Sequence, residues 1–143
     1  MKKGIIFAVI SILAVLLIAF FSIILPKIVW INNAREYAPY LFPGSTWVCK
    51  DPKIEYSVPE GVGEDLAKTE IDGEAVYFEL GIVNSYIEAI RYRGNGYATP
   101  DPDILFTGSI SYSENKFVIK IDKESDKLFE GKYDVLEFER NDN

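Results

Sequence analysis

The sequence predicts an all-β antiparallel meander, a small barrel of seven or eight strands, preceded by one N-terminal transmembrane helix. Residues 4–25 are an uncharged run of 22 residues. After position 44, apolar and polar side chains alternate with the period of half-buried strands, and turn residues separate the alternating runs. An open twisted sheet or a small sandwich is the alternative. Closure into a barrel is favoured because it leaves no strand edge unpaired.

The uncharged run 4–25 has the length of a membrane span. A helix of 22 residues is about 33 Å long at ~1.5 Å per residue, close to the ~30 Å of bilayer hydrocarbon. A cleaved signal peptide would have a shorter apolar region, about 7–15 residues, and a small-x-small site that the residues after Leu25 lack. A buried core helix is the other alternative. We therefore predict a single-pass anchor in the cell membrane, with residues 1–3 in the cytoplasm. Lys2 and Lys3 favour this orientation, which places the following domain outside.

Residues 26–43 are predicted to be a stalk between the membrane and a β domain of residues 44–143. Pro26 marks the expected helix exit, and the amphipathic ring of Trp30 is expected near the outer headgroups. Pro39 would end any helical extension. Because the stalk is rich in aromatic side chains, we expect it to pack on the domain or in the membrane interface.

The alternating runs predict strands at 45–50, 53–58, 66–71, 74–83, 86–93, 104–113, 116–122 and 132–140. Asp72-Gly73 is a strong hairpin signal because a type I′ turn needs two residues at positive φ. The segment 123–131 is interpreted as a short helical turn whose Leu128 and Phe129 plug one end of the structure.

Composition excludes several functions. The chain carries 15 basic and 22 acidic side chains and no histidine. Since Lys2 and Lys3 precede every acidic residue, the part beyond the anchor has a net charge of −9, which repels nucleic acid and anionic headgroups alike. Without histidine there is no Ser-His-Asp triad, no His-ligated zinc and no imidazole base. We predict no enzyme and no cofactor. Carboxylate-pair, Lys or Tyr chemistry is the remaining enzymatic alternative.

The single cysteine, Cys49, cannot form an internal disulfide. We expect it to pack as a small apolar residue in a strand, with an intermolecular bridge as the alternative.

Residues 44–47, with the sequence GSTW, open the first strand, and Arg140 stands near the end of the last. This pair resembles the opening G-x-W, here with one extra residue, and the closing arginine of lipocalin-like (calycin-like) barrels. The start W-x-C-x-D-P-x-I and the finish K-L-F-x-G-K-Y…F-x-R look like small membrane-anchored proteins of Gram-positive bacteria. The resemblance covers about residues 44–140. It implies a barrel in which the Arg140 guanidinium lies over the Trp47 indole within about 6 Å. It implies no activity.

The irregular segment 94–103, rich in Gly, Pro and Asp, is the predicted binding loop, because strand faces are committed to the core and the hairpins are short. The candidate binding residues are Arg93, Asn95, Tyr97 and Asp101. Asp101 and Asp103 could contribute to a calcium site, but their spacing fits no EF-hand loop, and we predict a solvated turn and no metal. A groove or mouth lined by tyrosines and arginines is a further alternative to simple cross-strand pairs, and its residues would be Tyr86, Tyr92, Tyr97, Tyr112, Arg91 and Arg93.

The predicted function is a membrane-anchored extracytoplasmic binding or interaction module. Its expected partners are the membrane, through residues 4–25, and a protein, peptide or cell-wall component of the envelope. The alternative is a lipocalin-like carrier of a small apolar molecule. A carrier needs a cavity, whereas about 100 residues rich in large aromatic side chains favour a filled barrel.

Overall fold

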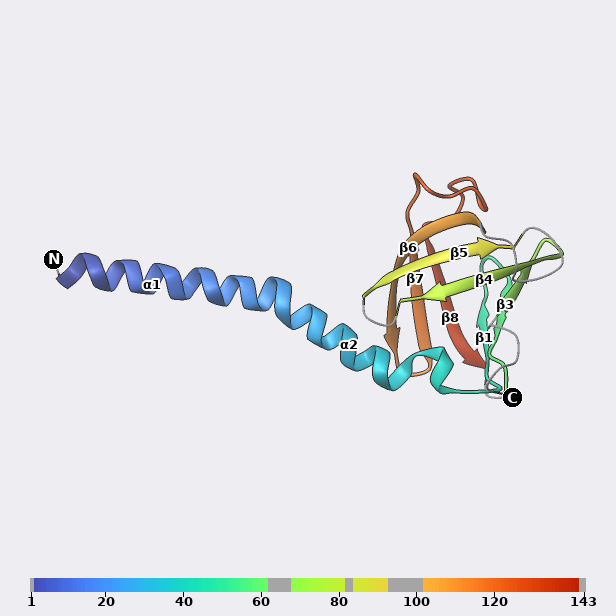
Figure 1. The fold of residues 1–143 in the computed structure, drawn as a ribbon, viewed down its shortest axis with the longest axis horizontal. Coiled ribbons are helices and arrows are strands. Elements are labelled where there is room, and N and C mark those ends of the chain that lie inside the picture. The colour runs from blue at the N-terminus through green and yellow to red at the C-terminus, as the bar shows by residue number, and fades with distance from the viewer. Residues whose placement is uncertain (1, 62–67, 82–83, 93–101, 142–143) are drawn as a thin grey trace.

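The computed structural model describes residues 2–61, 68–81, 84–92 and 102–141. An N-terminal helix leads into a closed barrel of eight antiparallel strands, arranged in chain order from β1 to β8 (Figure 1). The last strand returns to the first, with Trp47 opposite Arg140 and Cys49 opposite Phe138. The predicted fold class is therefore confirmed, and the barrel form is chosen over the open sheet.

The helical elements are α1 (Lys2–Ala19), the π-helical η1 (Phe20–Ile24), α2 (Leu25–Tyr37) and the 3-10 helix η2 (Pro39–Leu41). The strands are β1 (Thr46–Cys49), β2 (Ile54–Ser57), β3 (Lys68–Ile71), β4 (Glu74–Leu80), β5 (Tyr86–Arg91), β6 (Asp103–Ser113), β7 (Lys116–Ile121) and β8 (Val135–Asn141). Each lies within a run that alternation predicted, give or take one residue at either end.

The helix continues beyond Pro26, where we placed its exit. Pro26 has no N–H, and a proline ring in a helix crowds the carbonyl four residues earlier, here that of Ser22. The chain accommodates this by widening one turn. η1 is π-helical, its following Leu25 N–H bonds to the carbonyl of Phe20, and the axis bends where α1 meets α2 (Figure 1). The helix then runs on to Tyr37.

α2 covers an unpaired edge of β6. β5 pairs with β6 only as far as Ser109, whereas β6 runs on to Ser113. At the next position the Ile110 N–H donates to the Ser85 carbonyl (2.7 Å), which lies in the turn before β5. The Ile110 carbonyl accepts from the Trp30 indole Nε1 (2.7 Å). The indole thus takes the place of a strand partner, because an exposed strand edge needs its backbone groups satisfied.

Small side chains let α2 approach the barrel closely. Ala34 and Ala38 follow Trp30 at intervals of four residues, on the same helix face, and are 2% and 0% exposed. The Trp30 ring lies 5.8 Å from that of Tyr112 on β6, and Tyr37 packs against the core. The stalk predicted for residues 26–43 is therefore largely helix seated on the domain. The Trp30 indole, which we expected near the lipid headgroups, forms a hydrogen bond to the barrel through the Ile110 carbonyl.

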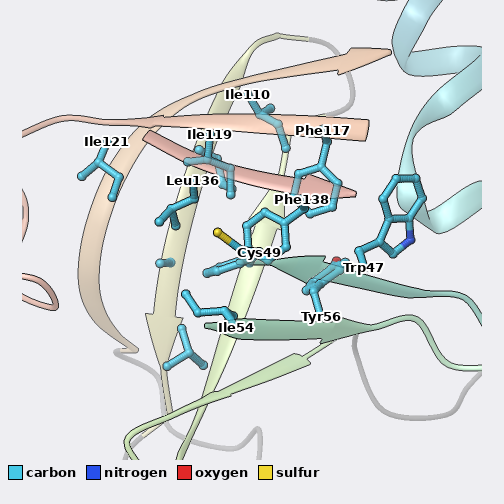
Figure 2. Packing of buried hydrophobic residues seen from close by; sticks show 14 of the residues in the cluster. Trp47, Cys49, Ile54, Tyr56, Ile110, Phe117, Ile119, Ile121, Leu136 and Phe138 are labelled. Carbon is cyan, nitrogen blue, oxygen red and sulfur yellow. The ribbon is translucent and has the colours of Figure 1, made fainter. Parts of the chain in front are cut away.

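Large rings fill the barrel (Figure 2). Phe117 and Phe138 are paired across β7 and β8 and stack at 4.5 Å between centroids. Tyr56 contacts both of these rings and also stacks on Phe78 (5.7 Å). Trp47 packs on Phe117 at 5.4 Å and is 0% exposed. Alternating positions of the strands thus point inward and close-pack, as period-two patterning requires.

The turns differ in how well the sequence predicted them. Asp72 and Gly73 both have positive φ (55° and 80°), which confirms the hairpin. The segment 123–131 is a series of turns and not a helical turn, with Glu130 and Gly131 at positive φ. Gly108 on β6 is also constrained, because a Cβ there would lie 2.2 Å from the Lys120 carbonyl oxygen.

We predict that Trp30→Phe loosens the helix from the barrel. The substitution keeps an aromatic ring but leaves the part-buried Ile110 carbonyl without its donor, which costs about 1–2 kcal/mol in free energy of unfolding. Chemical denaturation of the full chain in detergent measures the loss, and hydrogen exchange should quicken along α2. Tyr86→Phe is the control, since it removes only a solvent-exposed hydrogen bond, from the Tyr86 hydroxyl to the Glu88 carboxylate. Equal stability of both variants would contradict the assigned role of Trp30.

Candidate functional site

The barrel interior is occupied where a carrier would hold its ligand. Ring contacts of 4.5–6.1 Å between centroids run from Trp47 through Phe117, Phe138 and Phe78 to Phe106. At the outer end of this series Phe129 lies 6.1 Å from Phe106. In the part of the barrel that the structure describes, these side chains take up the central space. A binding surface therefore has to lie at one of the two ends of the barrel or on its outer wall.

Trp47 and Arg140 meet where the barrel closes. They are directly opposite each other on β1 and β8, so the first and last strands meet as expected, although the ring under the guanidinium is not the expected Trp47 indole. The ring beneath the Arg140 guanidinium is that of Phe42, 4.7 Å away, and Phe42 in turn lies 6.2 Å from Trp47. The Trp47 Nε1 donates to the Ser45 hydroxyl (2.8 Å). The cation therefore covers the aromatic cluster through Phe42, at the barrel end next to η2, and this pair is structural.

The opposite end of the barrel, which we call the distal mouth, is the best candidate for a binding surface. Neighbouring strands are antiparallel, so β1, β3, β5 and β7 all run toward this end, and the β1–β2 and β3–β4 turns and the 122–134 segment gather there. They enclose a depression of about 400 Å³. Its floor is apolar and its rim is charged with both signs. The floor comprises Ile54, Ile71, Leu128, Phe129 and Tyr133, and the rim Lys53, Glu70, Asp72, Glu130 and Lys132.

The 122–134 segment is held rigidly at the distal mouth. The Asp126 carboxylate accepts three backbone N–H groups, those of Leu128 (3.1 Å), Phe129 (2.9 Å) and Gly131 (2.8 Å). The Ser125 hydroxyl accepts from the Thr107 N–H on β6 (2.8 Å). This network, rather than a helical turn, presses Leu128 and Phe129 onto the core, so the expected plug is present in a different form.

The predicted binding residues Arg93, Asn95, Tyr97 and Asp101 lie outside the described residues. The ends of the strands that flank them are described, and both lie at the distal mouth. There Arg91 on β5 forms an ion pair with Asp103 on β6 (2.9 Å) and another with Glu74 on β4. Arg91 therefore ties three strands together at the base of this segment. The assignment of binding to the segment itself stays a prediction.

Of the tyrosines in the alternative aromatic groove, Tyr97 lies outside the described residues, and the structure does not bring the other three together. Tyr112 is buried beside α2, and Tyr86 is exposed with its hydroxyl on Glu88. Tyr92 packs on Tyr77 of β4 at 5.2 Å, close to the distal mouth. These are separate contacts on separate parts of the barrel.

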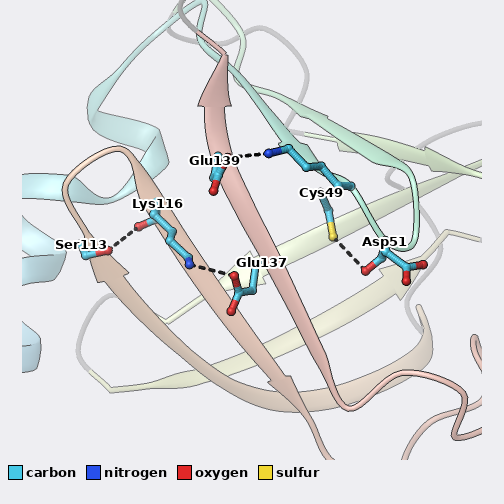
Figure 3. A network of polar contacts seen from close by, with 7 residues as sticks. Cys49, Asp51, Ser113, Lys116, Glu137 and Glu139 are labelled. Carbon is cyan, nitrogen blue, oxygen red and sulfur yellow. Dashed lines mark hydrogen bonds and ion pairs between the residues drawn. The ribbon is translucent and has the colours of Figure 1, made fainter.

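The outer wall over β7, β8 and β1 carries a polar network (Figure 3). Lys116 pairs with Glu137 (2.8 Å), and Lys50 pairs with Glu139 (3.2 Å). Such exposed pairs contribute little to stability. Beneath them Cys49 is a free thiol that is 1% exposed, and burial raises its pKa. Cys49 therefore packs as the small apolar residue that we expected.

Among the residues that the structure describes, no group of three His, Cys, Asp or Glu side chains is placed to hold a metal ion. A second groove of about 400 Å³ lies between α2 and the turn that joins β4 to β5. No family model, curated protein or solved structure matches this chain. The resemblance to lipocalin-like barrels thus stays a prediction about kinship, and function has to be inferred from the surfaces.

Sequence reasoning missed most of the distal mouth because its residues come from three separate turns. Of its floor, only Leu128 and Phe129 were assigned to a barrel end. Lys132 and Tyr133 also belong to this mouth, but in the sequence they stand out only as part of the K-L-F-x-G-K-Y pattern that carries the resemblance. Trp30, Ala34 and Ala38 also carried an unused signal, since their spacing of four residues marks a buried helix face.

We predict that Asp126→Ala destabilises the distal mouth. Losing a carboxylate that accepts three backbone hydrogen bonds should lower the free energy of unfolding by about 2 kcal/mol or more. Denaturation of the full chain in detergent measures this, and the amides of residues 128, 129 and 131 should exchange faster. Asp122→Ala is the matched control, because the Asp122 carboxylate accepts one long bond, from the Glu124 N–H (3.3 Å). An unchanged exchange rate in Asp126→Ala would refute the role.

Proposed function

We propose that this protein is a single-pass membrane protein that holds a β-barrel interaction module outside the cell. The observation that carries the proposal is the exposure of the apolar helix. Its helical run Lys3–Leu41 contains an 18-residue stretch with a mean hydropathy of 3.1, none of it buried inside the protein. Phe7 is 72% exposed and Ile18 66%. Leaving such a surface in water costs about 25 cal/mol per Å², and bilayer hydrocarbon removes that cost.

The orientation is argued from charge. Lys2 and Lys3 precede the apolar run, and on its other side Lys27 and Arg35 are partly balanced by Glu36. The positive-inside rule places the short basic end in the cytoplasm and the barrel outside.

The distal mouth is the proposed partner surface. The one strand edge described above, on β6, is covered by α2, aromatic rings fill the interior of the barrel, and α2 and η2 occupy its other end. A charged rim around an apolar, aromatic floor is the arrangement of many protein–protein interfaces. Because the rim carries both signs, its partner is a polypeptide segment of the envelope with mixed charge rather than a strongly basic or acidic polymer. The predicted residues Arg93, Asn95, Tyr97 and Asp101 lie outside the described residues, between the ends of β5 and β6 that reach this end of the barrel.

The carrier function is not favoured. A small apolar ligand would have to displace stacked rings such as Phe117 and Phe138 from the barrel centre. We likewise expect no catalysis, since the chain lacks histidine.

Cysteine labelling in intact cells tests the anchor and its orientation. Glu130→Cys at the distal mouth should react with a membrane-impermeant maleimide. Lys3→Cys should react only after lysis. The wild type is the control, because its one cysteine, Cys49, is buried. The reverse pattern of labelling would invert the orientation, and a soluble chain lacking residues 1–25 would mean that the helix is a cleaved signal.

Site-specific photo-crosslinking tests the partner surface. A crosslinking amino acid at Lys132, on the rim of the distal mouth, should give a discrete adduct with an envelope protein in living cells. The same amino acid at Lys120, an exposed position on the outer wall of β7, is the matched control and should give none. Tyr133→Ala should reduce the Lys132 adduct severalfold while the barrel remains folded. Equal adducts from both positions would move the partner surface to the outer wall.

A further inference from the structure

The groove between α2 and the β4–β5 turn lies where the apolar surface of the helix ends. Its described lining residues are Pro26, Lys27, Trp30, Ile31, Asn84 and Ser85. Pro26 and Lys27 directly follow the uncharged run 4–25. The end of β4 and the start of β5 lie on the same side of the barrel as α2 (Figure 1). With the span in a bilayer, the groove therefore opens at the level of the lipid headgroups.

Both walls of the groove are fixed by one residue. The Ile110 carbonyl accepts from the Trp30 indole on the helix side, and the Ile110 N–H donates to the Ser85 carbonyl on the turn side, each at 2.7 Å. The turn is also tight at its base, where the Gly81 N–H donates to the Tyr86 carbonyl (2.9 Å). The groove is thus preformed, so a ligand would lose no binding free energy in ordering its walls.

The lining is apolar on one side and polar on the other. Trp30 and Ile31 present the apolar wall, continuous along the helix with the exposed side chains of Ile24 and Ile28. Lys27 supplies an exposed cation at the mouth of the groove. The Asn84 Oδ1 accepts from the Tyr86 N–H (3.1 Å), which holds the side chain and leaves its NH₂ group to donate elsewhere. This combination suits a ligand with an apolar chain and an anionic head.

We propose that this groove binds one anionic glycerophospholipid of the leaflet that surrounds α2. The acyl chain follows Trp30 and Ile31, and the phosphate lies near Lys27 and the Asn84 amide. The occupant is a lipid because the apolar wall continues the membrane-facing surface of the helix. The inference rests on the membrane anchoring proposed above. The net charge of −9 beyond the anchor repels anionic headgroups in general, so attraction to an anionic lipid has to come from this local site.

Quenching of tryptophan fluorescence by brominated phospholipids tests the proposal. The chain has two tryptophans, Trp30 in the groove and Trp47 fully buried in the barrel, so Trp30→Phe gives the background. The full chain is reconstituted in phosphatidylcholine vesicles that contain a minor fraction of either brominated phosphatidylglycerol or brominated phosphatidylcholine. Trp30 should be quenched more strongly by brominated phosphatidylglycerol.

The preference for phosphatidylglycerol should depend on Lys27. Lys27→Gln should lower it about fivefold, the effect of one cation close to an anionic headgroup. Arg35→Gln makes the same change of charge at an exposed position about two turns further along α2 and should leave the preference intact.

Three results would overturn the proposal. If the chain is inserted but Trp30 is quenched equally by both lipids, with no response to Lys27→Gln, the indole contacts only bulk lipid. If soluble glycerol phosphate abolishes the preference, the site recognises a phosphate and not a lipid. If neither lipid quenches Trp30 and the protein stays in the aqueous phase, the anchoring itself fails, which is distinguishable from an inserted protein with an empty groove.

Discussion

The unequal length of β5 and β6 is the constraint on which the rest of the structure depends. β6 continues beyond Ser109, its last residue paired with β5. The backbone groups of its remaining residues would therefore be exposed to solvent on that side. α2 covers that edge, and the Trp30 indole satisfies the Ile110 carbonyl. Together with the packing of Ala34, Ala38 and Tyr37, this contact joins the apolar helix to the barrel, and the Trp30 side chain forms part of one wall of the groove. Without α2, the closed sheet would carry an unpaired edge along the last residues of β6.

A small closed barrel also dictates what its interior can do. Eight strands enclose a space just wide enough for side chains, and here aromatic rings fill it. Trp47, Phe117 and Phe138 form the centre, with Phe42 and Arg140 over one end and Phe129 over the other. Such packing holds both ends of the barrel rigidly and leaves no cavity for a ligand among these rings. The chemistry available for recognition is therefore on the turns.

Strands and fold class were predictable because each strand has one buried face. Apolar side chains therefore recur at every second residue, and this alternation with polar side chains is visible in the sequence. Asp72-Gly73 was predictable for an equally local reason, the positive φ of its turn. The continuation of the helix past Pro26 was not, because the packing of α2 on β6 outweighs a local rule about proline. The turns of 123–131 depend on where the Asp126 carboxylate finds its N–H donors, and alternation carries no such information.

The surfaces were harder to predict than the fold. The distal mouth assembles three turns, and the helix groove pairs residues more than fifty positions apart, such as Trp30 and Asn84. Neither shows as a motif, since each exists only once the barrel closes. Arg91, Glu74 and Asp103 illustrate the same point, because their pairing follows from strand order and not from spacing along the chain.

The continuous passage from α1 through α2 into the barrel has a mechanical consequence. A domain on a flexible linker explores a volume, whereas this one is held at the end of a stiff rod whose last segment, α2, is about 20 Å long. The barrel can turn about the rod and tilt with it, but it cannot reach outward. With the helix in a bilayer, as proposed, the encounters of the barrel would be confined to a thin layer next to the membrane, where a co-resident partner would arrive by lateral diffusion already partly aligned. Such a partner loses less rotational freedom on docking than one from bulk solution, so even a modest contact area can hold it.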